Sequence, residues 1–288
     1  MNPEPTTFWQ EIGDLPHSLS YVDVGAWNTR VVSVGDGEDT IVLMAGTSGH
    51  IEAFTRNIRA LAQTHRVIAY DYPGHGFSTL ADEDLEIADY EEHLIGLLDV
   101  LGLDKVHLCG ESLGGWIALK FAQNHPDRVK TLILSAPGGQ IVNQQAMGKA
   151  RSVSRDAVEN PTFSNVKARL QVVIHNPELI TDELVRVRQA VYGRPGFARS
   201  MGHILALQQP DIRFRNRVTE EDYAAVPVPT LLVWTDHEPS GGIETGERFA
   251  AALPDGELLL VRNAAHWPQW EDARAFNERA VDFLARKG

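Results

Sequence analysis

The sequence has one cysteine, few basic residues and no long hydrophobic run, and each shortage excludes a class of protein. Cys109 cannot form an intramolecular disulfide, and its apolar neighbours indicate a buried, inert thiol. The 26 Lys and Arg are outnumbered by 39 Asp and Glu; the net charge of −13 argues against nucleic-acid binding, which needs a basic surface. No run approaches membrane-spanning length, and Met1 to Gln10 lack a basic start and an apolar stretch. We expect a cytoplasmic protein without a membrane anchor that binds small molecules.

A globular fold is nevertheless well supported, because 288 residues with 43% hydrophobic side chains can bury a large core. Short β-branched runs alternate with segments of helical periodicity, which is typical of a mostly parallel sheet covered by helices. The first three predicted strands lie close together and indicate an antiparallel start. The strands expected in this half of the α/β fold are 19–24, 30–34, 40–44, 66–70, 105–109 and 129–134.

The alternation stops after Ser135, and residues 138–225 have helical periodicity with few strand signals. Helices are expected over 144–158, 162–175, 182–191 and 196–207. We interpret 138–225 as a helical cap inserted into a core made of residues 1–137 and 226–288. In the second half of the core, strands are expected over 230–234 and 257–261 and helices over 242–252 and 272–285.

Charge is distributed unevenly between the predicted cap and the core. Residues 138–217 contain 12 Lys and Arg against 6 Asp and Glu, a balance of +6, which leaves −19 for the rest of the chain. A positive cap would attract anions. The alternative is that surface helices simply differ in composition, and both interpretations stay open. The sequence leaves the oligomeric state open as well, a homo-oligomer included.

The strongest chemical signal is the segment Gly110-Glu-Ser-Leu-Gly-Gly115. It follows an apolar strand and precedes a helical run, so that a sharp turn would lift the hydroxyl of Ser112 above the sheet. The turn needs small neighbours, which Gly110 and Gly114 provide. The motif alone is common among loops, but between a strand and a helix it predicts that Ser112 is a nucleophile.

A serine nucleophile needs a general base and an acid that orients it, and in this type of fold the acid precedes the histidine in the chain. His266 follows the last predicted strand and is the favoured base. The competing His75 lies in a tight glycine turn. The acid is either Asp236 or Glu238, because both follow the strand predicted over 230–234.

The reaction also needs two backbone N–H donors for the oxyanion. Leu113, the residue after the nucleophile, would supply one of them. Thr47 would supply the other from the loop after the third strand, where Gly46 lets the backbone turn inward. The alternative is that this segment is only a connecting loop, which the fold also requires.

These motifs resemble those of the α/β-hydrolases that cleave carbon–carbon bonds in meta-ring-cleavage products of aromatic degradation. The resemblance spans nearly the whole chain. It rests on the loop at 46–50, the segment at 110–115, Ile180-Thr-Asp-Glu-Leu184 to Arg188, and His266-Trp-Pro-Gln-Trp-Glu-Asp-Ala273 with Phe276 and Asn277. The resemblance implies the α/β-hydrolase fold, no cofactor or metal, and hydrolysis of a 2-hydroxy-6-oxo-dienoate. Either Ser112 or an activated water would attack.

Several site residues follow from the resemblance. Arg188 matches the arginine that binds the substrate carboxylate, and Gly46, Glu111 and Trp267 fall among the substrate-binding positions. The acid commonly lies four residues after a tryptophan, which favours Glu238 over Asp236. The periodicity independently places Arg188 on an apolar helix stripe, where a guanidinium needs a ligand anion or a protein acid such as Glu111 as partner.

The chain departs from this group at three positions. Ala45 stands where many relatives have histidine, Glu111 where they usually have asparagine, and Glu238 where they have aspartate. A carboxylate at Glu111 would repel an anionic substrate unless it is paired or turned away. A carboxylesterase or lactonase, which needs no carboxylate clamp, is therefore the alternative function. A non-catalytic receptor on this fold is a further alternative, which an active-site serine probe would test.

Overall fold

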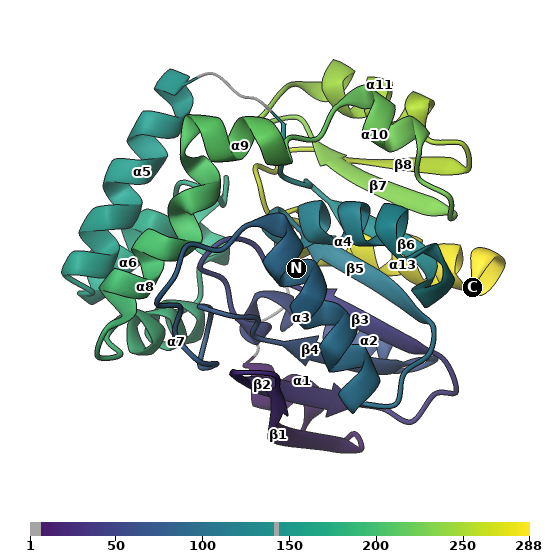
Figure 1. Cartoon of the computed structure of the whole chain (residues 1–288), viewed down its shortest axis with the longest axis horizontal. Coiled ribbons are helices and arrows are strands. Elements are labelled where there is room, and N and C mark those ends of the chain that lie inside the picture. Colours follow the sequence, from purple (N-terminus) through teal and green to yellow (C-terminus); the bar gives the residue numbers. More distant parts are fainter. Residues whose placement is uncertain (1–6, 141–143) are drawn as a thin grey trace.

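The computed structural model describes residues 7–140 and 144–288, with the backbone alone for 144–151. One eight-stranded sheet runs through the molecule in the order β1-β2-β4-β3-β5-β6-β7-β8 (Figure 1). The strands are β1 (His17–Val24), β2 (Trp27–Val34), β3 (Thr40–Met44), β4 (Arg66–Tyr70), β5 (Val106–Glu111), β6 (Val129–Ser135), β7 (Thr230–Thr235) and β8 (Gly256–Val261). Every strand expected from the sequence forms within two or three residues of its predicted ends.

The antiparallel start is confirmed for β1 and β2, but the prediction was wrong for the third strand. β1 pairs with β2 and β2 pairs with β4, both antiparallel, whereas β3 is parallel to β4 and to β5. The physical reason is burial. All five residues of β3 are buried, because the strand lies inside the sheet and is covered on both faces, as strands of parallel sheets are.

Helices cover both faces of the sheet. Figure 1 shows α3 and α4 in front of the strands and α13 behind them. α2 packs against α13 and α1, while α3 packs against α4. The helices outside the segment between β6 and β7 are α1 (Phe8–Ile12), α2 (Ile58–Leu61), α3 (Ile87–Val100), α4 (Leu113–Asn124), α11 (Ile243–Ala252), α12 (Pro268–Glu271) and α13 (Ala273–Lys287). The prediction of an α/β fold is thus confirmed.

Between β6 and β7 the described residues form only helices, and most of these lie beside the sheet at the left of Figure 1. They are α5 (Gln144–Glu159), α6 (Phe163–Leu170), α7 (Asp182–Tyr192), α8 (Phe197–Ile204), α9 (Pro210–Asn216) and α10 (Glu220–Ala224). Two predicted helices were too long: α6 ends at Leu170 instead of residue 175, and the last turn of the helix predicted over 196–207 becomes a separate 3-10 helix, Leu205–Gln208. α9 and α10 were not predicted. The division into core and cap at 138 and 225 stays a prediction, and 141–143 lie outside the described residues.

A buried ion network fixes the loop that follows β3. Arg30 on β2 donates to Glu52 at 2.7 Å and to Asp71 at 3.3 Å, and His50 Nδ1 lies 2.9 Å from the second oxygen of Glu52. Asp71 also accepts the backbone N–H of Ile51 at 2.8 Å. Each of these buried groups therefore has a partner, and together they hold the loop that leads away from Gly46.

No helix among the described residues is both long enough and apolar enough to cross a membrane.

Candidate active site

The site begins at the turn between β5 and α4. β5 lies between β3 and β6 in the middle of the sheet, and Ser112 directly follows its last residue. Ser112 has φ 53° and ψ −112°, a strained conformation that points a side chain out of the strand-to-helix turn. A Cβ on Gly110 would come within 2.3 Å of the Gly114 backbone, so a residue larger than glycine would push the turn apart.

Three side chains meet in line at the carboxyl ends of the parallel strands. The Oγ of Ser112 lies 2.8 Å from Nε2 of His266, and Nδ1 of the same ring lies 2.8 Å from Oε2 of Glu238. Ser112 follows β5, Glu238 lies in the loop after β7, and His266 lies in the loop after β8. Because these strands are parallel, their ends share one edge of the sheet, and residues far apart in sequence come together there.

Asp236 and His75, the alternative candidates for the acid and the base, make other contacts. Asp236 accepts the backbone N–H groups of Asn263 at 3.1 Å and Ala264 at 3.3 Å, and so stabilises the loop before His266. His75 is buried in the glycine turn after β4, where its Nδ1 lies 2.8 Å from the carbonyl of Pro73. The structure therefore brings Glu238, and not Asp236, to the imidazole of His266.

The imidazole of His266 is held in an environment that favours its charged form. Burial lowers its pKa, but the neighbouring carboxylate of Glu238 outweighs burial and raises the pKa to about 9. Glu111 contributes in the same direction, whereas Arg169 opposes it. A base with this pKa holds a proton strongly once it has taken one from a nucleophile.

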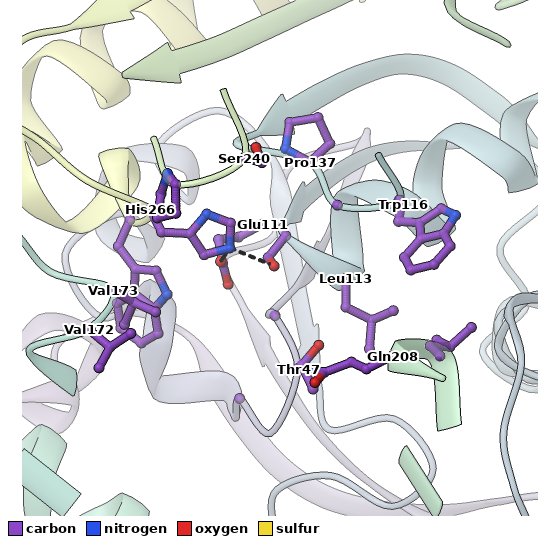
Figure 2. A pocket seen from close by; sticks show the side chains of 18 of the residues that line it. Thr47, Glu111, Leu113, Trp116, Pro137, Val172, Val173, Gln208, Ser240 and His266 are labelled. Atoms are coloured by element: carbon purple, nitrogen blue, oxygen red, sulfur yellow. Dashed lines mark hydrogen bonds and ion pairs between the residues drawn. The ribbon is translucent and has the colours of Figure 1, made fainter. Parts of the chain in front are cut away.

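The predicted oxyanion residues lie beside Ser112. Thr47 and Leu113 both line the same cavity and face it in Figure 2. Gly46 comes so close to the nucleophile turn that an added Cβ would meet Glu111 Oε2 at 2.5 Å and Ser112 Cβ at 2.9 Å. Only glycine therefore lets this loop approach the serine.

Glu111 is the least expected member of the site. Its side chain is 1% exposed, and neither carboxyl oxygen has a hydrogen-bond partner among the described residues. Oε1 lies 3.7 Å from Nε2 of His266, the nitrogen that also faces Ser112, and a dashed line marks this contact in Figure 2. Burial raises the pKa of Glu111 to about 7, although the charge of His266, the nearby Gly46 N–H, which does not reach hydrogen-bond geometry, and the charge of Arg188 oppose the rise.

Arg188 on α7 lies on the inward stripe, as the periodicity predicts, and is 1% exposed. Its guanidinium lies 5.4 Å from the ring of Trp267 and donates to the hydroxyl of Tyr192 at 3.4 Å, while Nε and Nη2 have no partner among the described residues. No described carboxylate lies within ion-pair distance, so the alternative of a salt bridge with Glu111 is not observed. Arg186 is exposed, and its guanidinium lies 5.4 Å from the ring of Phe163.

A cavity of about 490 Å³ joins these groups. Its walls are largely apolar and come from both the core and the helices between β6 and β7: Leu113, Trp116, Val172, Val173, Ile204, Leu207 and Trp267. Such an enclosure fits an organic molecule of moderate size better than a polymer. The described residues include no group of three His, Cys, Asp or Glu side chains that could hold a metal ion.

Sequence reasoning missed two charged residues of the cavity, Arg169 on α6 and Arg213 on α9. Nε and Nη1 of Arg169 are buried and lack hydrogen-bond partners among the described residues. The signal was available: Arg169 lies three residues after Val166 and one before Leu170, which are both buried, so it shares the inward stripe of its helix. The same rule that found Arg188 would have found it.

Comparisons with known proteins agree with this geometry. The family model for the alpha/beta hydrolase fold matches residues 39–273. A 2-hydroxy-6-oxononadienedioate/2-hydroxy-6-oxononatrienedioate hydrolase of Comamonas testosteroni is 32% identical over 264 residues, covering 87% of this chain and 89% of the relative. A 2-hydroxy-6-oxo-6-phenylhexa-2,4-dienoate hydrolase of Burkholderia cepacia is also 32% identical over 264 residues, with the same shares covered.

Solved structures show the same fold. A meta-cleavage product hydrolase from Pseudomonas fluorescens IP01 has 24% identity and a TM-score of 0.79, covering 96% of this chain and 99% of its own. Naproxen esterase from Bacillus subtilis has 21% identity and the same TM-score, covering 98% and 100%. Because both activities occur on this fold, the structural likeness supports the architecture alone. The family model and the sequence relatives decide the family: the chain is an enzyme of the α/β-hydrolase family, and it is similar to the meta-cleavage product hydrolases within it.

Proposed function

We propose that this enzyme hydrolyses the C5–C6 carbon–carbon bond of a 2-hydroxy-6-oxo-dienoate, with Ser112, His266 and Glu238 as its catalytic triad. One observation supports this above all: the buried guanidinium of Arg188, which has no carboxylate partner among the described residues, lines the same apolar cavity as an assembled serine–histidine–carboxylate set. A buried cation without a partner is costly unless a ligand anion completes it. The sequence relatives, which are named as hydrolases of such dienoates, have substrates that carry this anion.

The chemistry follows from the positions of the groups. The bound dienol first becomes a ketone, with its 2-hydroxyl proton lost and a proton gained at C5. His266 then accepts a proton from Ser112 or from a water as this nucleophile attacks the carbonyl carbon C6. The N–H groups of Leu113 and Thr47 would stabilise the oxyanion. Cleavage of the C5–C6 bond releases a carboxylic acid and a 2-hydroxydienoate.

Binding of the substrate would divide between charge and apolar contact. Arg188 would hold the carboxylate of the dienoate by a charge-assisted hydrogen bond through its free Nε and Nη2. The indole of Trp267 would help to hold the guanidinium by a cation–π contact, since the two lie 5.4 Å apart. The apolar walls around Trp116 and Leu207 would contact the acyl group that leaves as the acid.

Ester hydrolysis is the second candidate, because naproxen esterase has the same fold and a triad suits both reactions. An esterase, however, has no use for an unpaired arginine in its acyl cavity. The deciding experiment compares kcat/KM for a panel of 2-hydroxy-6-oxo-dienoates, followed by loss of their yellow absorbance, with kcat/KM for p-nitrophenyl esters of similar size. We expect the dienoates to be much better substrates. Rapid ester hydrolysis with no bleaching of any dienoate would establish the esterase instead.

A further inference from the structure

The position of Glu111 raises a question that the triad does not answer. A buried carboxyl group that faces the same imidazole nitrogen as the nucleophile should hold His266 in its charged form, which cannot act as a base. Glu111 Oε1 is 3.7 Å from Nε2, and both of its oxygens lack hydrogen-bond partners among the described residues. This carboxyl group therefore has a free site for a proton right beside the base.

We propose that Glu111 and His266 share one proton, and that an anionic substrate bound at Arg188 moves this proton onto Glu111. The step is a transfer from Nε2 of His266 to Oε1 of Glu111. A cationic imidazole and a carboxylate become a neutral imidazole and a carboxylic acid, so the net charge of the pair does not change. Glu111 acts through His266 as a positioning residue for the proton. The proposal rests on the proposed function in that it requires a substrate anion at Arg188.

The groups around Glu111 decide the direction of the transfer. His266 and Arg188 stabilise its anion, and Glu238 opposes it; Arg169 and Tyr72 also interact with its charge from α6 and from the loop after β4. A substrate carboxylate at Arg188 would cancel the positive charge of that arginine. The Glu111 anion then loses one of its two main stabilising charges, and the proton is held better by the carboxyl group than before.

The transfer has two useful results. His266 becomes neutral and can accept the proton of Ser112, and Glu111 becomes an uncharged acid that no longer repels the substrate. In the free enzyme His266 is protonated. Only an anion bound in the cavity makes His266 neutral and able to act as a base. This arrangement would make the enzyme prefer anionic over neutral substrates beyond what the contact with Arg188 alone provides.

The pH dependence of kcat/KM tests the proposal, because the active pair must carry one proton. For a dienoate, the wild type should give a bell with limbs near the pKa values of the pair, about 7 and about 9. At one pH unit above the upper limb the rate constant should be roughly 10-fold below its maximum. A neutral p-nitrophenyl ester needs only a neutral imidazole, so its kcat/KM should rise through the upper value without falling.

Glu111→Gln removes the shared proton but keeps a side chain of the same size. We expect a single rise for the dienoate with a midpoint between the two wild-type limbs, and no fall at high pH. The matched control is Glu91→Gln, which changes a buried carboxyl group that is hydrogen-bonded to Asn124, outside the cavity. The Glu91→Gln enzyme should keep both limbs of the pH profile for the dienoate. An alkaline fall that persists in Glu111→Gln, or one that the neutral ester shares, would overturn the proposal.

A second measurement keeps the test independent of dienoate turnover. In wild-type enzyme with ¹⁵N-labelled histidine at pH 8, saturating 2-oxopentanoate should convert His266 from cationic to neutral, with His266→Asn used to assign its signals. An anion ordinarily makes an imidazole more cationic, and that is the expected response in Glu111→Gln. A more cationic His266 in the wild type, or no binding of 2-oxopentanoate, would refute the proposal. If no dienoate is cleaved but the conversion occurs, only the proposed function fails.

Discussion

The sheet end of the molecule, meaning the strands and their loops, partners its buried charges differently from the end covered by α6 and α7. At the sheet end, Arg30 lies between Glu52 and Asp71, and His266 lies between Ser112 and Glu238, so each group has a partner within 3.3 Å. At the end covered by α6 and α7, Arg169 and Arg188 have guanidinium nitrogens with no hydrogen-bond partner among the described residues. Glu111 lies between these two regions and shares the character of the second.

This difference separates structural charges from charges that await a ligand. Burying an ion costs several kcal/mol unless partners replace its lost water, so a fold selected for stability alone would pair or remove it. The charges of the sheet end are paired within the protein: Arg30 with Glu52 and Asp71 holds a loop in place, and Glu238 orients His266. Those of the other end have no carboxylate partner in the part of the chain that the structure describes, and a ligand anion could complete them. Substitutions in the Arg30 network should therefore affect folding, whereas substitutions in the triad and at the end covered by α6 and α7 should affect turnover.

The largest effect is expected at the nucleophile. Ser112→Ala should lower kcat for the dienoate by about 10⁴-fold or more, because the attacking oxygen or its hydrogen bond to His266 is lost. The strand-to-helix turn keeps its backbone, so circular dichroism and the melting temperature should change little. Activity close to that of the wild type would remove Ser112 from the mechanism.

The next effect concerns the acid of the triad. Glu238→Gln should lower kcat by about 10³-fold, because an amide does not stabilise the imidazolium or hold its tautomer. Asp236→Asn is the matched control: its carboxylate caps backbone N–H groups, so we expect activity within a few-fold of the wild type and a small loss of stability. The reverse ranking in steady-state kinetics would give the role to Asp236.

Stability should respond most strongly where charges are paired. Arg30→Met leaves Glu52 and Asp71 buried without their cation, and the free energy of unfolding should fall by about 3 kcal/mol. Urea denaturation followed by tryptophan fluorescence measures this. An unchanged midpoint of urea denaturation would show that the Arg30 network does not stabilise the fold.

At the end covered by α6 and α7, removing a buried arginine charge should affect turnover instead of stability. Arg188→Gln should lower kcat/KM for the dienoate by at least ~10-fold, in line with the loss of a charged hydrogen bond, and leave neutral esters nearly unchanged. The free energy of unfolding should stay level or rise, since an unpaired buried cation is removed. Equal losses on both substrates together with a lower melting temperature would mean that Arg188 holds the helices together.

Much of the fold was predictable because the signals are local. A buried strand needs an apolar run, and a nucleophile turn needs glycines around a serine, so β5, Ser112 and α4 could be placed from a dozen residues. The orientation of β3 could not be predicted, since a short fully buried strand has no alternation to show which neighbour it pairs with. Helices α9 and α10 were missed because they are only two turns or fewer.

The site was predictable where chain order and helix periodicity decide it. Ser112 and His266 follow from the order of the elements, and Arg188 from its position on a stripe. The choice between Asp236 and Glu238 depends on how the loop after β7 bends, which no local pattern determines. The proximity of Glu111 to His266 could not be predicted either, because Glu111 ends β5 and His266 lies 155 residues later in the loop after β8, and only the assembled sheet brings them together.

The insertion between β6 and β7 also bears on how such an enzyme can change over evolutionary time. β6 and β7 are adjacent parallel strands, with Ser135 opposite Val233, so the whole intervening segment behaves as one long loop whose ends are already joined. The entropy of closing such a loop grows only logarithmically, by roughly 0.6 kcal/mol for each doubling of its length. Helices can therefore be added, lost or exchanged in this segment at small thermodynamic expense. Substrate range can diversify there while the register that aligns Ser112 with His266 is inherited unaltered.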